Sequence, residues 1–339
     1  MLLSICIPSY NRFEELEKNL ISISKAQSND FDVWVIDNVS KERLNFTLND
    51  SRIHYVYREE SVSSFLSIRT CLDFGNGDYK MLCLDKDFII GEELDRFLEQ
   101  LKKNSHISCG YCILNSHNKN GLLKISKYSI DKQLYHCYHP SGYFFRKDIV
   151  KWDSENIDIY SKESVFFSNA FNVEFVYAKA LTLGYEGCFS GRLIETESLE
   201  KARNCKSFTY STKKDNVYFL PNARKKQMNI FIQHMDFLNL EYDIYKNAIR
   251  MLCKNTMLYC TIWYSNILKS AEICEHNGVK QINISLFKLL DEAYKFSIYF
   301  RDLHIPKISK LRKIYYLLLA WLYFLIELMK NFLHKLGLR

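Results

Sequence analysis

Met81-Leu-Cys-Leu-Asp85-Lys-Asp87-Phe-Ile-Ile90 places two carboxylates, two residues apart, in a run that is otherwise mostly apolar. An apolar run of this kind predicts a buried central strand of a sheet. Buried carboxylates are costly unless they are paired or bind a metal ion. In an extended chain Asp85 and Asp87 share one face, so their oxygens could converge on one hard cation. The alternative is that the strand ends at Leu84 and the aspartates lie in a solvated turn.

The composition is that of a globular protein. The chain has 339 residues, of which 47% are hydrophobic and 25% charged, enough for one large or two modest domains. Its 11 cysteines are scattered, and the first apolar stretch, residues 2–7, reads as a strand rather than a signal peptide. We therefore expect reduced, buried thiols. Cys109 and Cys112 have C-x-x-C spacing without a second pair, and we interpret them as part of a strand.

The positive charge is concentrated near the C-terminus. The whole chain carries +7, and residues 305–339 contribute seven Lys or Arg against one acid, Glu327. The preceding part is therefore close to neutral. By charge it is not a nucleic-acid-binding surface, so we expect no nucleic acid partner.

Strand and helix signals alternate along about the first hundred residues. This alternation predicts an α/β fold with a mostly parallel sheet that is covered on both faces. In such sheets ligands bind beyond the carboxyl ends of the strands. Residues 8–11, 37–38 and 85–87 are polar and follow predicted strands, so they are the candidate site. The predicted strands are 2–7, 31–36, 53–57 and 79–84, and the predicted helices are 13–24, 63–74 and 94–101.

The second half of the chain has a different pattern. Residues 107–146 read as less regular strands, and helical periodicity dominates after about residue 215, over 228–237, 242–268 and 281–300. We expect three parts: an α/β domain over 1–212, a helical subdomain over 213–304 and a separate segment over 305–339.

The last segment combines a basic run, residues 307–313, with thirteen apolar residues, Ile314–Ile326. This apolar run is shorter than the ~20 residues that span a bilayer. Flanking cations with Trp and Tyr inside the run predict an amphipathic helix at the interface of an anionic membrane. The alternatives are a helix docked in the core or a dimer interface.

Three motifs together resemble family 2 glycosyltransferases with the GT-A fold. They are Ser4-Ile-Cys-Ile-Pro-Ser-Tyr-Asn-Arg-Phe-Glu-Glu-Leu16, Val35-Ile-Asp37-Asn38 and Leu84-Asp85-Lys86-Asp87. Their order and spacing are similar to the family's over roughly the first 100 residues. The resemblance implies a Rossmann-like domain that binds a nucleotide-diphosphate sugar. The chain length and the turn at 139–142 are also similar to bacterial enzymes that add a deoxysugar (abequosyl-type) to a lipid-linked O-antigen intermediate of lipopolysaccharide.

The resemblance implies roles for the polar strand ends. Asp85 and Asp87 would bind a divalent metal, Mn²⁺ or Mg²⁺, which offsets the charge of the leaving diphosphate. Asp37 would bind the base and ribose of the nucleotide. Arg12 or Arg58 could meet phosphate, although a solvated surface cation is the commoner role of such an arginine. The residues implied to contact the nucleotide-sugar are Pro8, Tyr10, Asn11, Arg12, Asp37, Asn38 and Asp85.

Inverting transfer needs a general base that takes a proton from the acceptor hydroxyl. Family members carry an acidic pair about eleven residues before a glycine. Residues 180–184 resemble the end of that segment, but Asn172-Val173 stands where the acids belong. The nearest candidates are Glu163, as first choice, and then Asp158 and Glu174.

The resulting expectation is an inverting transferase that adds a single sugar to a lipid-linked saccharide in bacterial surface polysaccharide synthesis. It would be cytoplasmic and peripheral on the inner face of the plasma membrane. One alternative is a sugar-phosphate nucleotidyltransferase, but residues 8–12 lack the Gly-rich loop that such an enzyme needs. Another is a non-catalytic scaffold on a degenerate transferase fold. The missing acidic pair favours the scaffold, whereas Asp37, Asp85 and Asp87 count against it.

Overall fold

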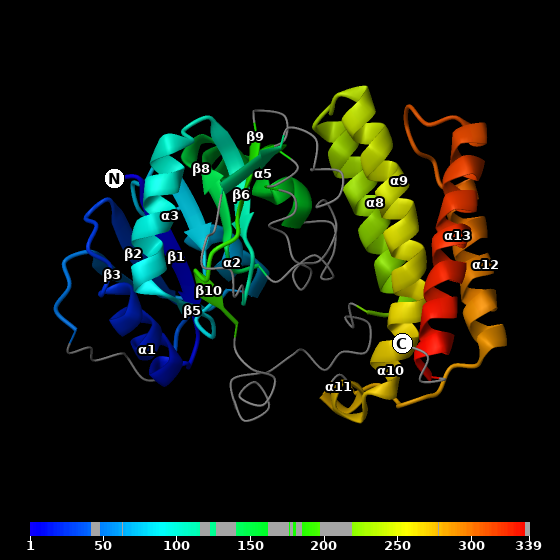
Figure 1. The fold of residues 1–339 in the computed structure, drawn as a ribbon, viewed down its shortest axis with the longest axis horizontal. Coiled ribbons are helices and arrows are strands. Elements are labelled where there is room, and N and C mark those ends of the chain that lie inside the picture. The colour runs from blue at the N-terminus through cyan, green and yellow to red at the C-terminus, as the bar shows by residue number, and fades with distance from the viewer. Residues whose placement is uncertain are drawn as a thin grey trace. The chain divides into compact units, whose positions relative to one another are not determined.

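The computed structural model describes residues 1–41, 48–62, 64–115, 123–126, 140–161, 176, 179–180, 185–196, 219–276 and 278–335. These residues fall into two compact units, an α/β unit that ends before residue 210 and a helical unit that follows it. Both units are drawn in Figure 1.

The α/β unit is built on an eight-stranded sheet with strand order β3-β2-β1-β4-β8-β6-β9-β7. The four strands β3, β2, β1 and β4 are mutually parallel, and β6 is parallel to β9. Strand β8 is antiparallel to its two neighbours, β4 and β6. Strand β7 is antiparallel to β9. The predicted α/β class with a mostly parallel sheet is confirmed. The strands are β1 (Leu3–Ser9), β2 (Phe31–Asp37), β3 (Ile53–Tyr57), β4 (Tyr79–Leu82), β6 (Ile107–Cys112), β7 (Leu123–Ser126), β8 (Tyr143–Arg146) and β9 (Tyr185–Phe189).

Helices cover both faces of the sheet. On one face, Ile5 of β1 lies in a buried apolar cluster with Leu20 of α1 and Phe97 of α3. Successive side chains of a strand point to opposite faces. Cys6 therefore faces the other side, where α2 packs against β1 and β2 and α5 against β4 and β8. The helices of this unit are α1 (Phe13–Ile23), α2 (Ser64–Cys71), α3 (Gly91–Lys103) and α5 (Lys147–Ser161).

Helix α3 begins very close to α1. A Cβ added at Gly91 would lie 2.1 Å from the backbone oxygen of Ser22, so only glycine allows this approach. The first turn of α3 carries Glu92 and Glu93 and its last turn Lys102 and Lys103, a charge distribution that complements the helix dipole. The close contact fixes where α3 starts, directly after the acidic stretch.

The stretch from Met81 to Ile90 is not one strand. Strand β4 ends at Leu82, and the amide of Asp87 donates to the carbonyl of Leu84 at 3.0 Å to close a turn. A short strand follows, β5 (Phe88–Ile89), which pairs antiparallel with β10 (Ile194–Glu195). The predicted shared face of an extended strand is therefore wrong. The alternative is confirmed in part: the strand ends before the aspartates and they lie in a turn, but the turn is not solvated, because Asp87 is 2% exposed.

The helical unit confirms the predicted helical pattern, although the helix expected over 281–300 begins only at Leu286. Two further differences concern its longer helices. The helix expected over 242–268 contains a π-helical segment at 259–263. The C-terminal helix has 26 residues, twice the apolar run, and its part Lys310–His334 is by length and composition long and apolar enough to cross a membrane. The elements are α8 (Pro221–Phe237), α9 (Tyr242–Leu258), η2 (Tyr259–Trp263), α10 (Tyr264–Lys269), α11 (Ala271–His276), α12 (Leu286–Asp302) and α13 (Lys310–Lys335).

Candidate functional site

Three polar strand ends meet at one edge of the sheet. Strand β1 lies between β2 and β4 and is parallel to both, so all three carboxyl ends point the same way. Ser9, the last residue of β1, is the register partner of Asp37, the last residue of β2. The turn that contains Asp85 and Asp87 follows β4. The structure thus brings together the strand ends that the sequence singles out.

Asp85 is held against the turn that follows β1. Its Oδ2 accepts a hydrogen bond from the backbone amide of Tyr10 at 3.1 Å, and its Oδ1 lies 3.9 Å from Nε of Arg12. The Asp85 side chain is 13% exposed and that of Arg12 is 6% exposed. Burial raises the pKa of Asp85 to about 6, against the opposing effect of Arg12. A solvated surface role for Arg12 is therefore wrong, because its guanidinium is buried beside this carboxylate.

Asp87 is held by a residue from a distant part of the chain. The hydroxyl of Ser141 donates to Oδ2 of Asp87 and accepts from the backbone amide of Leu84 at 2.8 Å. Gly142, with φ of 90°, follows it, and its amide donates to the carbonyl of Leu82 at 2.8 Å. The sequence shows a turn near residue 140 but contains no signal that its serine supports Asp87.

Asn19 holds the same acidic turn from the side of α1. Its Oδ1 accepts from the amide of Ile89 at 2.8 Å, and its Nδ2 donates to Sγ of Cys83 at 3.8 Å. Asn19 is fully buried. The signal that could have found it is an amide side chain on the apolar face of a helix, next to Leu20.

Only one oxygen of the Asp37 carboxylate accepts a hydrogen bond from the described residues. Its Oδ1 accepts from the amide of Ser40 at 2.7 Å. Its Oδ2 is buried without a hydrogen-bond partner among them, and so is the hydroxyl of Ser9. A buried acceptor without a donor is costly unless a ligand or water satisfies it. The pair is therefore a place where an N–H or O–H of a ligand can bind.

Asn11 connects the turns that follow β1 and β2. Its φ of 53° lies in the left-handed region, which asparagine tolerates better than most residues. Its amide donates to the hydroxyl of Ser40 at 2.8 Å, and its Oδ1 accepts from the amide of Lys41 at 2.9 Å. Pro8 is buried within β1, whereas the Tyr10 ring at the end of this strand is exposed.

Asn38 has a structural partner. Its Nδ2 donates to the carbonyl of Val62 at 2.9 Å, and its Oδ1 accepts from the amide of the same residue at 2.9 Å. Arg58 is also engaged: its amide donates to the carbonyl of Asp37 at 3.1 Å, and its Nη2 donates to Oγ1 of Thr70 at 2.5 Å. Both residues shape the loop beside Asp37, and Arg58 is not the solvated cation that its type suggests.

The acidic turn fits a hard divalent cation. Asp85 and Asp87 supply carboxylate oxygens, which Mg²⁺ and Mn²⁺ prefer. The raised pKa of Asp85 shows that burial of its charge is not fully compensated, and a cation would compensate it. Within the described ranges no three His, Cys, Asp or Glu side chains gather around a common point.

The candidates for the general base cannot be placed in the site. Glu163 and Glu174 lie outside the described residues, as do Asn172, Val173 and Gly184. The backbone of Asp158 lies in α5, but its side chain is outside the described part.

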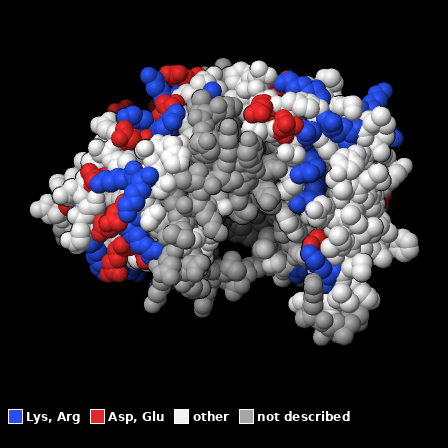
Figure 2. Space-filling view, turned by 45° about the horizontal axis from the view of Figure 1, so that its top comes forward, with Lys and Arg blue, Asp and Glu red and all other residues white. Residues whose placement is uncertain are grey.

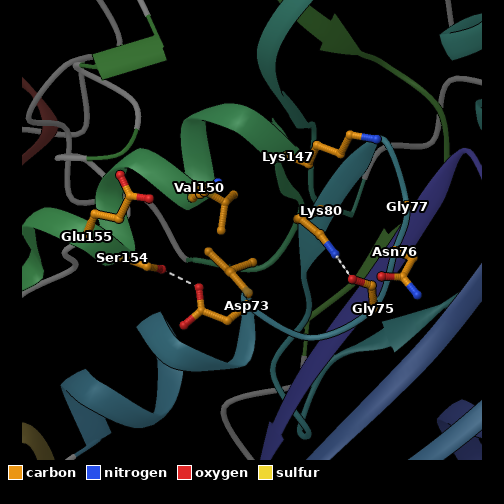
Figure 3. A pocket seen from close by; sticks show the side chains of 11 residues that line it. Asp73, Gly75, Asn76, Gly77, Lys80, Lys147, Val150, Ser154 and Glu155 are labelled. Carbon is orange, nitrogen blue, oxygen red and sulfur yellow. Dashed lines mark hydrogen bonds between the residues drawn. The ribbon is translucent and has the colours of Figure 1, made fainter.

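A separate hollow of 680 Å³ lies at the opposite end of the sheet, between residues 72–80 and α5. Figure 3 shows the Lys80 ammonium directed at the carbonyl of Gly75, to which it donates at 2.5 Å, and the Ser154 hydroxyl directed at Asp73. These polar groups are therefore already hydrogen-bonded to each other or to the backbone of the loop. No residue singled out from the sequence lines this hollow.

Comparison with known proteins agrees with the motifs. The model of the "Glycosyl transferase family 2" family matches residues 4–171. An uncharacterized glycosyltransferase of Haemophilus influenzae is 30% identical over 111 residues, which is 32% of this chain. The match spans 38% of that relative's length.

Two solved structures of S. aureus TarS 1–349 have a similar fold. One has a TM-score of 0.52 at 12% identity, covering 88% of this chain and 90% of that one. The other, in complex with UDP-GlcNAc, has a TM-score of 0.56 at 15% identity, with coverage of 88% and 81%.

Proposed function

Because the model of glycosyl transferase family 2 matches residues 4–171, we propose that this chain transfers a single sugar from a nucleotide-diphosphate donor to a saccharide acceptor. One observation carries the proposal: two acidic turns, at Asp37 and at Asp85–Asp87, flank the carboxyl end of β1 at one sheet edge. Ligands of parallel sheets bind at this edge.

The turn after β2 is proposed to bind the nucleoside. Oδ2 of Asp37 and the hydroxyl of Ser9 are buried groups that a base N–H or a ribose hydroxyl can satisfy. The exposed ring of Tyr10 can offer an apolar face to the base. The neighbour TarS in complex with UDP-GlcNAc makes a UDP-sugar the first donor to test.

The turn after β4 is proposed to bind the diphosphate through a divalent metal, Mn²⁺ or Mg²⁺, held by Asp85 and Asp87. When bound, the metal supplies positive charge next to the leaving diphosphate. Arg12, buried beside Asp85, adds a fixed cation that opposes the rise in the pKa of this carboxylate and can meet a phosphate oxygen. Ser141 and Asn19 keep the turn in place.

The finer features of the reaction are proposals of the same kind. We propose inversion at the anomeric carbon, with Glu163 or Asp158 as the base that receives the acceptor proton. We propose a lipid-linked acceptor in bacterial O-antigen or other surface polysaccharide synthesis. The site of action would be the cytoplasmic face of the plasma membrane.

The test is a calorimetric titration of the full chain with UDP, in the presence and absence of Mn²⁺. We expect Mn²⁺ to tighten UDP binding at least tenfold. Asp85→Asn and Asp87→Asn should remove this metal dependence, whereas Asp37→Asn should weaken UDP binding equally with and without metal. The exposed Glu99→Gln on α3 is the matched control and should change neither quantity.

UDP binding that is independent of metal in the unsubstituted protein would overturn the metal site. A product assay then separates the reaction classes. Release of UDP from a UDP-sugar supports the transferase, and release of pyrophosphate from UTP and a sugar phosphate supports a nucleotidyltransferase instead. Metal-dependent binding without turnover of any donor in a panel would support a non-catalytic scaffold.

A further inference from the structure

An apolar stripe runs along the outer face of α13. Six large side chains recur on it at alternating four- and three-residue spacing and lie within one narrow sector of the helix. All are exposed, Leu318 by 65% and Met329 by 64%. At 1.5 Å per residue, the stripe from Leu311 to Met329 is about 27 Å long. The stripe consists of Leu311, Tyr315, Leu318, Leu322, Leu325 and Met329.

The opposite face of α13 is fixed to its neighbours. Tyr316, Ala320 and Phe324 are buried, and the Tyr316 hydroxyl donates to the carbonyl of Lys246 in α9 at 3.1 Å. Trp321 Nε1 donates to the hydroxyl of Ser297 in α12 at 2.9 Å. Thus α9, α12 and α13 form one packed layer, and α13 does not leave it as a separate helix (Figure 1).

The amino end of α13 is tied to the carboxyl end of α12. The buried Lys313 ammonium donates to the carbonyls of Arg301 and Leu303 at 2.7 and 2.8 Å. Cations in this position satisfy the free carbonyls at the end of a helix. This anchor fixes the rotation of α13, so the stripe faces away from α9 and α12.

A row of cations borders the stripe on the side of α9. Lys246, Arg250 and Lys254 recur every four residues on α9. The Lys254 ammonium lies 4.8 Å from the centre of the Tyr323 ring, and Arg312 lies 5.6 Å from that of Tyr242. Figure 2 shows basic side chains in a line down the helical unit, with few acidic ones between them.

This row also argues against a spanning orientation of α13. If α13 crossed a bilayer with its neighbours in place, the three cations of α9 would enter the hydrocarbon, where each is expensive. At the interface their aliphatic stems can lie on apolar surface while the charges reach lipid phosphates. An apolar stripe beside a cation row is complementary to the surface of an anionic membrane.

We propose that α13 and α9 together form a docking surface that lies flat on an anionic lipid bilayer. The apolar stripe of α13 enters the acyl boundary, and Lys246, Arg250 and Lys254 bind headgroup phosphates. The surface extends beyond the C-terminal segment to a helix about sixty residues earlier in the chain. It is independent of the donor site, since all its residues lie in the helical unit.

Flotation of the full chain with vesicles tests the surface. One set is pure phosphatidylcholine, and the other also contains phosphatidylglycerol. The variant Lys246→Gln, Arg250→Gln, Lys254→Gln should lose about a hundredfold in partitioning onto the anionic vesicles, given the usual contribution of each cation near such a surface. The matched control, Lys18→Gln, Lys25→Gln, Lys103→Gln, removes three exposed cations of the α/β unit and should bind as the unsubstituted protein does.

A second variant tests the apolar stripe of α13. Leu318→Glu with Leu322→Glu should abolish binding to both kinds of vesicle, whereas Ile21→Glu with Ile282→Glu, at exposed apolar positions elsewhere, should not. Unchanged thermal unfolding and UDP binding show that each variant is folded. Extraction by alkaline carbonate is expected, because the helix does not span.

Three results would overturn the proposal. If the α9 variant and its charge-matched control lost the same amount of vesicle binding, the loss would reflect net charge and not the position of the cations. Resistance to carbonate would indicate a spanning helix. The third result combines two measurements. If the unsubstituted protein did not bind vesicles and had a dimeric mass by light scattering, and if Leu318→Glu with Leu322→Glu made it monomeric, the stripe would bind a second copy of the chain.

Discussion

Ser141 and Asp87 are 54 residues apart in the chain, and the Ser141 hydroxyl donates a hydrogen bond to the Asp87 carboxylate. The same hydroxyl accepts from the amide of Leu84, so one side chain fixes both ends of the acidic turn. Asp87 is therefore oriented by the chain itself before any ligand arrives.

Replacing this hydroxyl should weaken metal binding. Ser141→Ala removes the hydrogen bond to the buried Asp87 carboxylate and the side-chain acceptor of the Leu84 amide, at a cost of about 1–3 kcal/mol in the free energy of unfolding. Groups that orient a metal ligand commonly contribute about 10–100-fold to metal affinity. Calorimetry with Mn²⁺ and UDP should show a loss in this range, with Ser24→Ala on the surface of the same unit as the control. Unchanged metal affinity in Ser141→Ala would remove Ser141 from the site.

The burial of Asp85 predicts a pH dependence of stability in the metal-free protein. Burial raises its pKa from 3.8 to about 6, so between these values the folded protein holds a proton that the unfolded chain has lost. The free energy of unfolding contributed by this group should therefore fall as the pH rises from 4 to 6, by roughly 3 kcal/mol in total, and stay constant above.

Urea unfolding at several pH values measures this contribution as the difference between the unsubstituted protein and Asp85→Asn. The difference is needed because salt-bridged carboxylates such as Asp50, whose pKa is lowered by Arg52, give the opposite slope. A difference that does not change with pH would show that the charge of Asp85 is already compensated.

Gly142 should resist substitution. Its φ is 90°, and an added Cβ would lie 3.2 Å from both Cβ of Cys112 and Cδ1 of Ile194. Gly142→Ala should lower the free energy of unfolding by about 2–3 kcal/mol, from backbone strain and crowding together. The control is Gly278→Ala, which has a positive φ but no atom within 4 Å of the added Cβ. It should cost about 1 kcal/mol. Equal losses of stability in the two variants would mean that crowding at Gly142 has no effect.

Asn38 should prove to be a structural residue. Asn38→Ala removes both hydrogen bonds to Val62, so the free energy of unfolding should fall by about 1–2 kcal/mol. The preference among UDP, GDP and CDP, measured by competition, should not change. Asp37→Asn is the comparison, because it alters the carboxylate oxygen to which no described residue donates. A changed base preference in Asn38→Ala would return Asn38 to the nucleotide-binding residues.

The parallel half of the sheet could be predicted because each strand is a short apolar run followed by polar residues. Phe31–Asp37 and Ile53–Tyr57 agree with the expected strands to within a residue. The helix predicted within 305–339 is observed as α13, which continues past the apolar run through Glu327 and Lys330. They pair at 2.5 Å on the surface of the helix and do not break it.

The environment of the acidic turn could not be predicted for a different reason. Its shape depends on Asn19 and Ser141, whose partners lie 70 and 54 residues away. Periodicity and spacing report on neighbours along the chain, not on such contacts. The burial of Arg12 was missed in the same way, since it results from packing beside Asp85, 73 residues later.

The pairing of β5 with β10 has a consequence for the order in which the site forms during synthesis. Strand β5 follows Asp87 immediately, and its partner is made about a hundred residues later. A nascent chain that ends near residue 115 already contains every carboxylate of the strand ends, yet it lacks both Ser141 and Ile194. The acidic turn can reach its final shape only once the chain has emerged from the ribosome as far as Glu195, and no shorter N-terminal fragment should retain the site.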